Sequence, residues 1–168
     1  MRSVILQKGK SLLKCRENFT TKEEYKIQTL EDAQQLSVSI ANNTSKPNEN
    51  LVICELLNNA IEHGNLGITY DEKSDLIEKD IFLEEIERRQ NLLENRDKYA
   101  EVVIKKCLEG GMVVTIIDQG KGFDFNKYLS IDNSRLFESH GRGIAIANTI
   151  LKIQYLDKGN KVVVFFPA

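Results

Sequence analysis

No stretch of the sequence is apolar for long enough to cross a membrane, and residues 1–14 lack the core of a signal peptide. The cysteines Cys15, Cys54 and Cys107 stand far apart and form no CxxC or Cys/His metal pattern, so reduced thiols are expected. Basic and acidic residues are interleaved, with a formal net charge of -2, which argues against a cationic surface for nucleic acid. These absences predict a cytoplasmic protein without a membrane or nucleic-acid partner.

The remaining composition is that of an ordinary globular protein. The 168 residues are 41% hydrophobic and 29% charged, and no tract rich in Pro, Ser or Gly interrupts them. This length is typical of one domain, so a single domain over residues 1–168 is predicted. Residues 24–29 alternate polar and apolar side chains as a strand does, and residues 1–24 are expected to form an N-terminal β extension in which residues 2–7 pair with that strand.

Two helices are predicted in the first half of the chain. Thr29 and Asp32 have the spacing of a capping box, which predicts a helix that fades at Asn42. The second helix, 49–63, is apolar around most of its circumference and is therefore expected to be largely buried, with Gly64 as its C-terminal stop.

A long charged stretch, 66–98, follows and is interpreted as an insertion. Thr69 and Glu72 form another capping box, which predicts an amphipathic helix or a helix pair broken at Asp80. Four apolar side chains are predicted to share one face: Leu76, Leu83, Ile86 and Leu93. Such a segment either covers the sheet or core as a solvated helix or docks a partner.

The second half of the chain is rich in strand patterns. Residues 99–108 and 112–118 read as a hairpin joined by 109–111, and residues 161–166 read as a final strand after a short helix at 143–150. This order predicts an α+β fold: a two-layer α/β sandwich with helices on one face of a mostly antiparallel mixed sheet.

A polar stripe on the second helix is the first candidate site. Glu55, Asn59 and Glu62 fall on one face at 3.6 residues per turn, so either this face meets water or it borders a cleft with a polar ligand. The carboxamide oxygen of Asn59 suits Mg²⁺, and Glu55 one turn earlier could act as a base.

Two glycine-framed segments follow. Asp118, directly after an apolar strand, precedes Gly120 and Gly122, which suits a carboxylate that accepts from the amino group of a flat base, or else a simple glycine turn. Further on, Gly141, Arg142 and Gly143 open a helix that continues with Ile144. A helix start of this kind suits a phosphate, or else it is an ordinary loop entering a helix.

The order and context of these three segments resemble the N, G1 and G2 boxes of the GHKL ATPases, over roughly residues 25–166. Within that superfamily, the sequence around Glu55 and Asn59, then DQGKGFD, then HGRGIAIAN, is most similar to the anti-sigma-factor serine/threonine kinases of bacterial partner switching. The resemblance implies a Bergerat ATP-binding fold, with ATP and Mg²⁺ as cofactors.

The resemblance also implies roles. Asn59 would coordinate Mg²⁺ bridging the ATP phosphates, Glu55 would be the general base for a substrate hydroxyl, and Asp118 would recognise the adenine amine. Gly120 and Gly122 would shape the nucleotide pocket. His63 would mainly support the structure, with a phosphate contact as the alternative. The phosphates would lie beneath a lid at 125–139, against Gly141, Arg142, Gly143 and Ile144.

The partner implied by the resemblance is a STAS-like anti-sigma antagonist that accepts phosphate on Ser or Thr, with a sigma factor as a further partner and a homodimer as an option. Other readings stay open. The domain could sense ATP without transferring phosphate, it could be a histidine-kinase ATPase domain, or it could be a structural α+β domain without nucleotide. Nothing before Tyr25 resembles a phospho-accepting dimerisation hairpin, which disfavours the histidine kinase.

Overall fold

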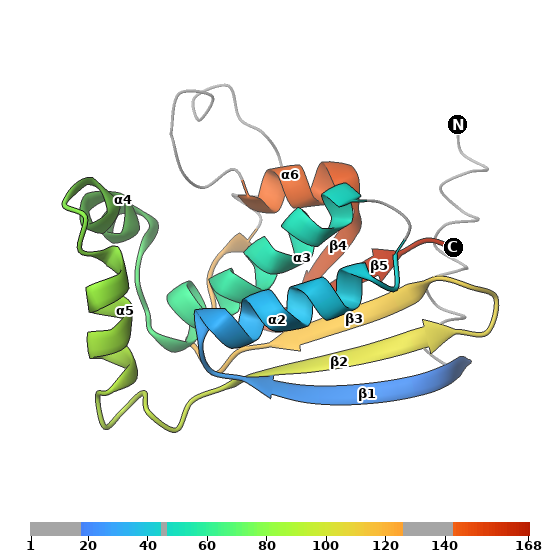
Figure 1. Cartoon of the computed structure of the whole chain (residues 1–168), viewed down its shortest axis with the longest axis horizontal. Coiled ribbons are helices and arrows are strands. Elements are labelled where there is room, and N and C mark those ends of the chain that lie inside the picture. Colours follow the sequence, from blue (N-terminus) through green and yellow to red (C-terminus); the bar gives the residue numbers. More distant parts are fainter. Residues whose placement is uncertain (1–17, 45–46, 126–142) are drawn as a thin grey trace.

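A five-stranded antiparallel sheet with helices on one face forms the body of the molecule (Figure 1). The computed structural model describes residues 18–44, 47–125 and 143–168. Across the sheet the strands run β1 (Phe19–Ile27), β2 (Ala100–Cys107), β3 (Met112–Ile117), β5 (Lys161–Phe166) and β4 (Lys152–Leu156). All four pairings are antiparallel, so the expected two-layer α+β arrangement is confirmed, while no parallel pair occurs among the described strands.

The hairpin of β2 and β3 agrees with the predicted one to within a residue at each strand end, and β5 has the bounds predicted for it. Its turn has Gly110 and Gly111 at positive φ, a conformation that glycine adopts without the steric penalty of a Cβ. Strand β1 begins earlier than predicted and pairs with β2, whereas residues 2–7 lie outside the described part of the chain. Strand β4 was not predicted at all, although it completes the sheet beside β5.

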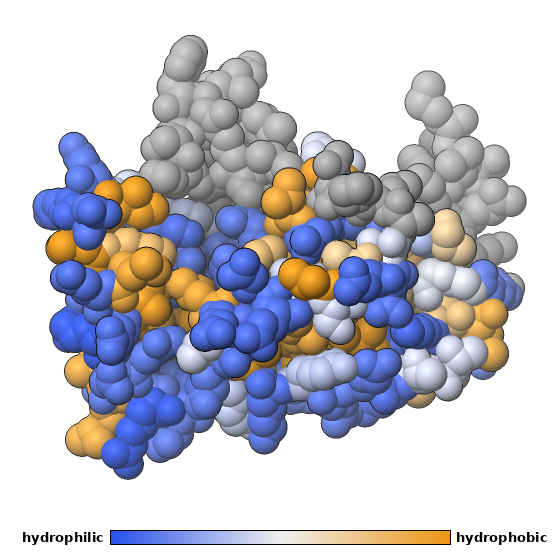
Figure 2. Space-filling view, in the orientation of Figure 1, coloured by the Kyte–Doolittle hydropathy of each residue, from blue (hydrophilic) through white to orange (hydrophobic). Residues whose placement is uncertain are grey.

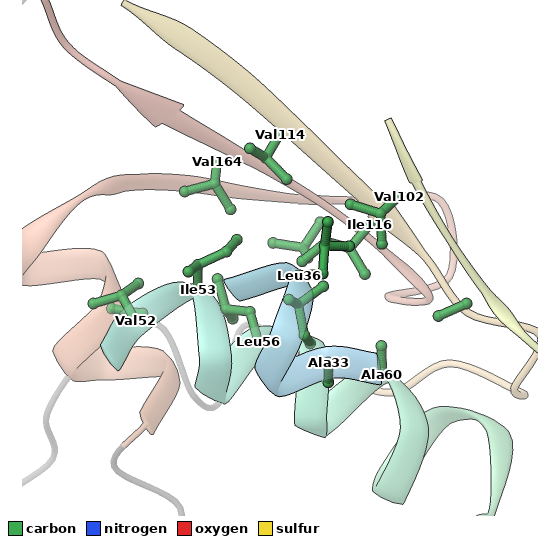
Figure 3. Close-up of a cluster of buried hydrophobic side chains, with 14 of the residues drawn as sticks. Ala33, Leu36, Val52, Ile53, Leu56, Ala60, Val102, Val114, Ile116 and Val164 are labelled. Atoms are coloured by element: carbon green, nitrogen blue, oxygen red, sulfur yellow. The ribbon is translucent and has the colours of Figure 1, made fainter. Parts of the chain in front are cut away.

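The core lies between the sheet and three helices: α2 (Leu30–Ala41), α3 (Pro47–Asn59) and α6 (Gly143–Ile150). In Figure 3 side chains of the helices, among them Leu36, Ile53 and Leu56, point toward Val114 and Val164 of the sheet. Each such side chain stabilises the fold by about 1.5–3 kcal/mol when fully buried. The core therefore fixes α3 across the sheet, with one of its ends beside the end of β3.

The capping predicted for α2 is confirmed, because the Thr29 hydroxyl accepts from the Asp32 N–H and the Asp32 carboxylate accepts from the Thr29 N–H. The predicted end of the next helix is wrong. Helix α3 starts at Pro47 and continues into a π-helical segment, η1 (Ala60–Asn65), so that Gly64 lies inside the helical turn instead of after it. Gly64 allows close packing there, because a Cβ at this position would overlap the Asp118 carboxyl group.

The insertion is a pair of short helices, α4 (Tyr70–Glu78) and α5 (Phe82–Gln90), separated at Asp80 with φ 56°. The capping box at Thr69 is confirmed. The prediction of one shared apolar face is wrong: Ile86 is buried, but Leu83 and Leu93 are 70% and 77% exposed. Because the chain breaks at Asp80, the 3.6-residue spacing of α4 does not continue into α5. Figure 2 shows hydrophobic residues among hydrophilic ones at the α4–α5 end of the molecule.

Two further expectations from the sequence have structural outcomes. None of the helices in the described ranges is long and apolar enough to span a membrane. Cys54 is a free thiol, but Cys107 is disulfide-bonded, so the prediction of reduced thiols is wrong at this residue. Spacing along the chain does not report spacing in the fold, which is why the pattern misled here; Cys15 lies outside the described residues.

Candidate functional site

A cavity of about 980 Å³ opens where the end of α3, the end of β3 and the start of α6 meet. This volume lies in the range of small-molecule sites, roughly 300–1,000 Å³. The cavity brings together five of the residues predicted from the sequence: Asn59, Asp118, Gly120, Gly122 and Ile144. Segments that are far apart in the chain thus share one wall, as a ligand site would require.

Asn59 presents an oxygen that no described residue satisfies. Its side-chain N–H lies 3.4 Å from the Glu55 carboxylate, and its Oδ1 atom is buried without a hydrogen-bond partner. Because buried polar atoms are normally paired, an orphaned carboxamide oxygen on a cavity wall fits a ligand or a hard cation such as Mg²⁺.

Glu55 is held back from the cavity. It is half-buried and bonded to the Asn59 side chain, but it does not line the wall formed by the described residues. The structure therefore places Glu55 next to the predicted metal ligand, one helical turn behind it. A substrate hydroxyl would reach its carboxylate only if the Glu55 side chain turned away from Asn59.

Asp118 is a carboxyl group on the cavity wall whose pKa is strongly shifted. Burial raises the pKa of its carboxyl to about 6, opposed by the Gly120 N–H bond and the positive charge of Lys158. Oδ1 accepts from that Gly120 N–H at 2.8 Å, and the main-chain oxygen accepts from the Asn160 side chain at 3.0 Å. The second carboxylate oxygen, Oδ2, can therefore accept a hydrogen bond from a ligand.

Glycines allow the segments around Gly64, Asp118 and Lys158 to approach one another closely. A Cβ added at Gly64 would overlap the Asp118 carboxyl group, and one added at Gly120 would overlap the Gly64 carbonyl. Gly122, at φ 79°, packs in the same way on the carbonyl of Lys158. These positions require glycine because backbone and carboxylate occupy the space that a side chain would need.

The third predicted segment is described only in part. Gly141 and Arg142, with most of the predicted lid at 125–139, lie outside the described residues. Gly143 is the first residue of α6, and Ile144 after it is buried and lines the cavity. The first turn of α6 thus contributes Ile144 to the cavity wall.

His63 supports the turn, in agreement with its main predicted role. Nδ1 is hydrogen-bonded to the Ile68 carbonyl, so it carries the proton, and the ring packs on Tyr70 with centroids 4.2 Å apart. Burial lowers the pKa of the imidazole, which keeps it neutral at physiological pH. Nε2 is buried and has no partner in the described structure.

Several lining residues were not predicted from the sequence. Tyr155 comes from the unpredicted strand β4, and its ring packs on Phe123 with centroids 5.2 Å apart. Asn65 follows Gly64 at the end of η1, and its position directly after the predicted helix 49–63 and its glycine was the one available signal. The insertion also contributes wall residues, among them Arg89 and Lys98.

The insertion is fixed to the site by three cations. Lys73 forms an ion pair of 2.5 Å with Glu62, whose carboxyl pKa is raised by burial despite that pair. Arg89 donates to the Leu66 carbonyl at 3.1 Å, and it also pairs with acidic residues of both insertion helices. Lys98 donates to the Asn65 carbonyl at 3.0 Å. These bonds hold the turn that carries His63 to Asn65.

Among the residues that the structure describes, no three His, Cys, Asp or Glu side chains gather as a metal site. A cation at Asn59 would therefore depend on one protein oxygen together with oxygens of a bound ligand, as Mg²⁺ often does with phosphates. Comparison of the chain with protein-family models, curated proteins and solved structures gave no match.

Proposed function

We propose that the protein is an ATP-binding domain with a Bergerat fold, a cytoplasmic serine/threonine kinase similar to the anti-sigma-factor kinases of partner switching. One observation carries the proposal: the orphaned oxygen of Asn59, the carboxylate of Asp118 and the start of α6 at Ile144 share a single cavity. The acceptor would be Ser or Thr of a STAS-like antagonist, with a sigma factor as a further partner and a homodimer as an option.

The adenine end of the nucleotide is assigned to Asp118. With its pKa at about 6, the carboxyl is mostly ionised at pH 7.4 and can accept a hydrogen bond from the exocyclic amine. A charged acceptor in a partly dry pocket makes this bond stronger than one between neutral groups. The close glycine packing around Gly64 and Gly120 keeps side chains out of the space beside it.

The phosphate end is assigned to Asn59 and to the start of α6. Asn59 Oδ1 fits a Mg²⁺ ligand, and a bound Mg²⁺ would neutralise phosphate charge during transfer. The N–H groups at the start of α6, at Gly143 and Ile144, suit an anion because the helix dipole is positive there. Glu55 would take the proton of the attacking hydroxyl once its bond to Asn59 is released.

The position of Glu55 also supports a second candidate, a module that binds ATP and changes its affinity for a partner without transferring phosphate. In this reading the Glu55 carboxylate only orients Asn59, as its hydrogen bond already does. Nucleotide binding is common to both candidates, and phosphate transfer separates them.

Calorimetry with Mg²⁺-ATP tests the binding step. The wild-type protein is expected to bind, and Asn59→Ala is expected to lose the dependence on Mg²⁺. Asn58→Ala is the matched control, because its side chain is on the same helix but does not line the cavity. A folded wild-type protein that gives no heat with Mg²⁺-ATP would refute the proposal.

Transfer of labelled phosphate from ATP to a STAS-like antagonist then tests catalysis. Glu55→Ala is expected to retain ATP binding and lose transfer, because the hydroxyl would have no base. If wild-type protein binds ATP but labels no antagonist, the sensing module is favoured. If Glu55→Ala labels the antagonist at the wild-type rate, Glu55 is not the base.

A further inference from the structure

The side chain of Asn65 is held in one orientation at the edge of the cavity. It is 3% exposed and lines the cavity at the end of η1. Oδ1 accepts from the Gln119 main-chain N–H at 2.9 Å, and the Asn65 carbonyl accepts from Lys98 Nζ at 3.0 Å. A main-chain N–H can only donate, so the carboxamide oxygen must face Gln119 and the NH₂ group must face elsewhere.

That NH₂ group has nothing to donate to. Nδ2 of Asn65 is buried and has no hydrogen-bond partner within the described structure. Leaving a buried donor unsatisfied costs about 1–3 kcal/mol, and most such groups in folded proteins are paired. A carboxamide that is oriented by its bond to Gln119, lines the cavity and still has an unpaired NH₂ group is suited to a ligand that accepts from it.

The neighbour of this donor is the proposed adenine acceptor. Asn65 bonds to the main chain of Gln119, which directly follows Asp118, and Gly64 next to Asn65 packs on the Asp118 carboxyl. Since Asp118 Oδ1 already accepts from Gly120, the cavity wall offers one carboxylate acceptor, Oδ2, and one amide donor on residues that a single bond to Gln119 links.

This pair complements adenine. Adenine carries an amine that donates, flanked by ring nitrogens N1 and N7 that accept, whereas guanine has an accepting O6 next to a donating N1–H. We propose that Asn65 is a base-specificity residue whose side-chain NH₂ donates to a ring nitrogen beside the amine, directly or through one water. The proposal rests on ATP binding at this cavity and assigns to Asn65 the second half of adenine recognition.

Calorimetry with ATP and its deaza analogues tests the proposal on the unmodified protein. Replacing the accepting nitrogen by C–H, in either 1-deaza-ATP or 7-deaza-ATP, should weaken binding about tenfold, which corresponds to about 1.4 kcal/mol. The other of these two analogues, and 3-deaza-ATP as control, should bind like ATP. Equal binding of ATP and all three analogues would overturn the role of Asn65 while leaving ATP binding intact.

Asn65→Asp provides the matched variant. It keeps an oxygen for the Gln119 N–H and replaces the donating NH₂ with an oxygen of a negatively charged carboxylate, so the decisive readout is the discrimination between analogues and not the affinity alone. The variant should bind ATP more weakly and should no longer distinguish the sensitive deaza analogue from ATP. A variant that still distinguishes it overturns the assignment. If wild-type protein binds no ATP at all, the proposed function fails together with this inference.

Discussion

Removing the buried charge at the end of β3 should stabilise the protein and abolish recognition of the nucleotide. In Asp118→Asn the Oδ1 atom can still accept from the Gly120 N–H, so the variant mainly loses the negative charge. The carboxyl has a pKa of about 6 in the folded protein, against an ordinary value of 3.8 for an aspartate side chain. This difference means that burial disfavours the ionised form.

The sign and size of the effect follow from linkage. Between pH 4 and pH 6 the folded state binds more protons than the unfolded state, so wild-type stability falls as the pH rises through this window. A difference of about 2 pKa units at 1.36 kcal/mol each gives a loss of about 3 kcal/mol above pH 7. The amide does not titrate, so the stability advantage of Asp118→Asn should grow from pH 4 to pH 6 and then level off.

Urea denaturation of both proteins at pH 4.5, 6 and 8 measures this difference, and calorimetry at pH 8 measures the lost ATP affinity. Contributions of other titrating groups, such as Glu62 and His63, cancel to first order because both proteins contain them. The amide does not titrate, so its own effect on the free energy of unfolding is the same at all three pH values. If the difference in unfolding free energy between the two proteins were the same at all three pH values, burial in this cavity would not raise the pKa of Asp118.

Three further substitutions test the wall of the cavity. Gly64→Ala should destabilise the protein by about 1–3 kcal/mol and displace the carboxylate at the end of β3, as urea denaturation and ATP calorimetry would show. Lys73→Met should lower stability by about 3 kcal/mol at pH 7, because Glu62 stays buried without its partner, and less at low pH, where Glu62 is protonated; adding Glu62→Gln should recover most of the loss. Arg89→Lys should lower the melting temperature, because lysine cannot make the separate bonds of the guanidinium, whereas Arg88→Lys on the exposed side should change nothing measurable.

Elements with a local chemical signal were predicted well. The capping boxes at Thr29 and Thr69, the glycine hairpin at Gly110 and the helix starting at Gly143 each depend on residues a few positions apart. Strand β4 has only five residues and depends on pairing with β5, a contact that its own sequence does not reveal. Its alternating pattern was the single local clue.

The same distinction between local signals and contacts distant in the sequence applies to the site. Asn59 and Asp118 could be selected from their segments, since a polar stripe on a buried helix and a carboxylate before glycines are visible in the sequence. The π-helical segment η1 could not be predicted in this way, because the position of Gly64 depends on its contact with Asp118, which is distant in the sequence. For the same reason Asn65 was missed: its significance comes from the bond to Gln119, 54 positions away.

The contacts of the insertion indicate a structural role that its composition did not predict. Its charges looked like a solvated surface, yet Lys73, Arg89 and Lys98 each donate to the turn between α3 and α4. That turn carries Asn65, which bonds to the residue after Asp118, so the two insertion helices stabilise this part of the cavity wall. These contacts favour the covering role over a partner-docking role, and they imply that a partner which displaced these helices would also disturb the proposed nucleotide site.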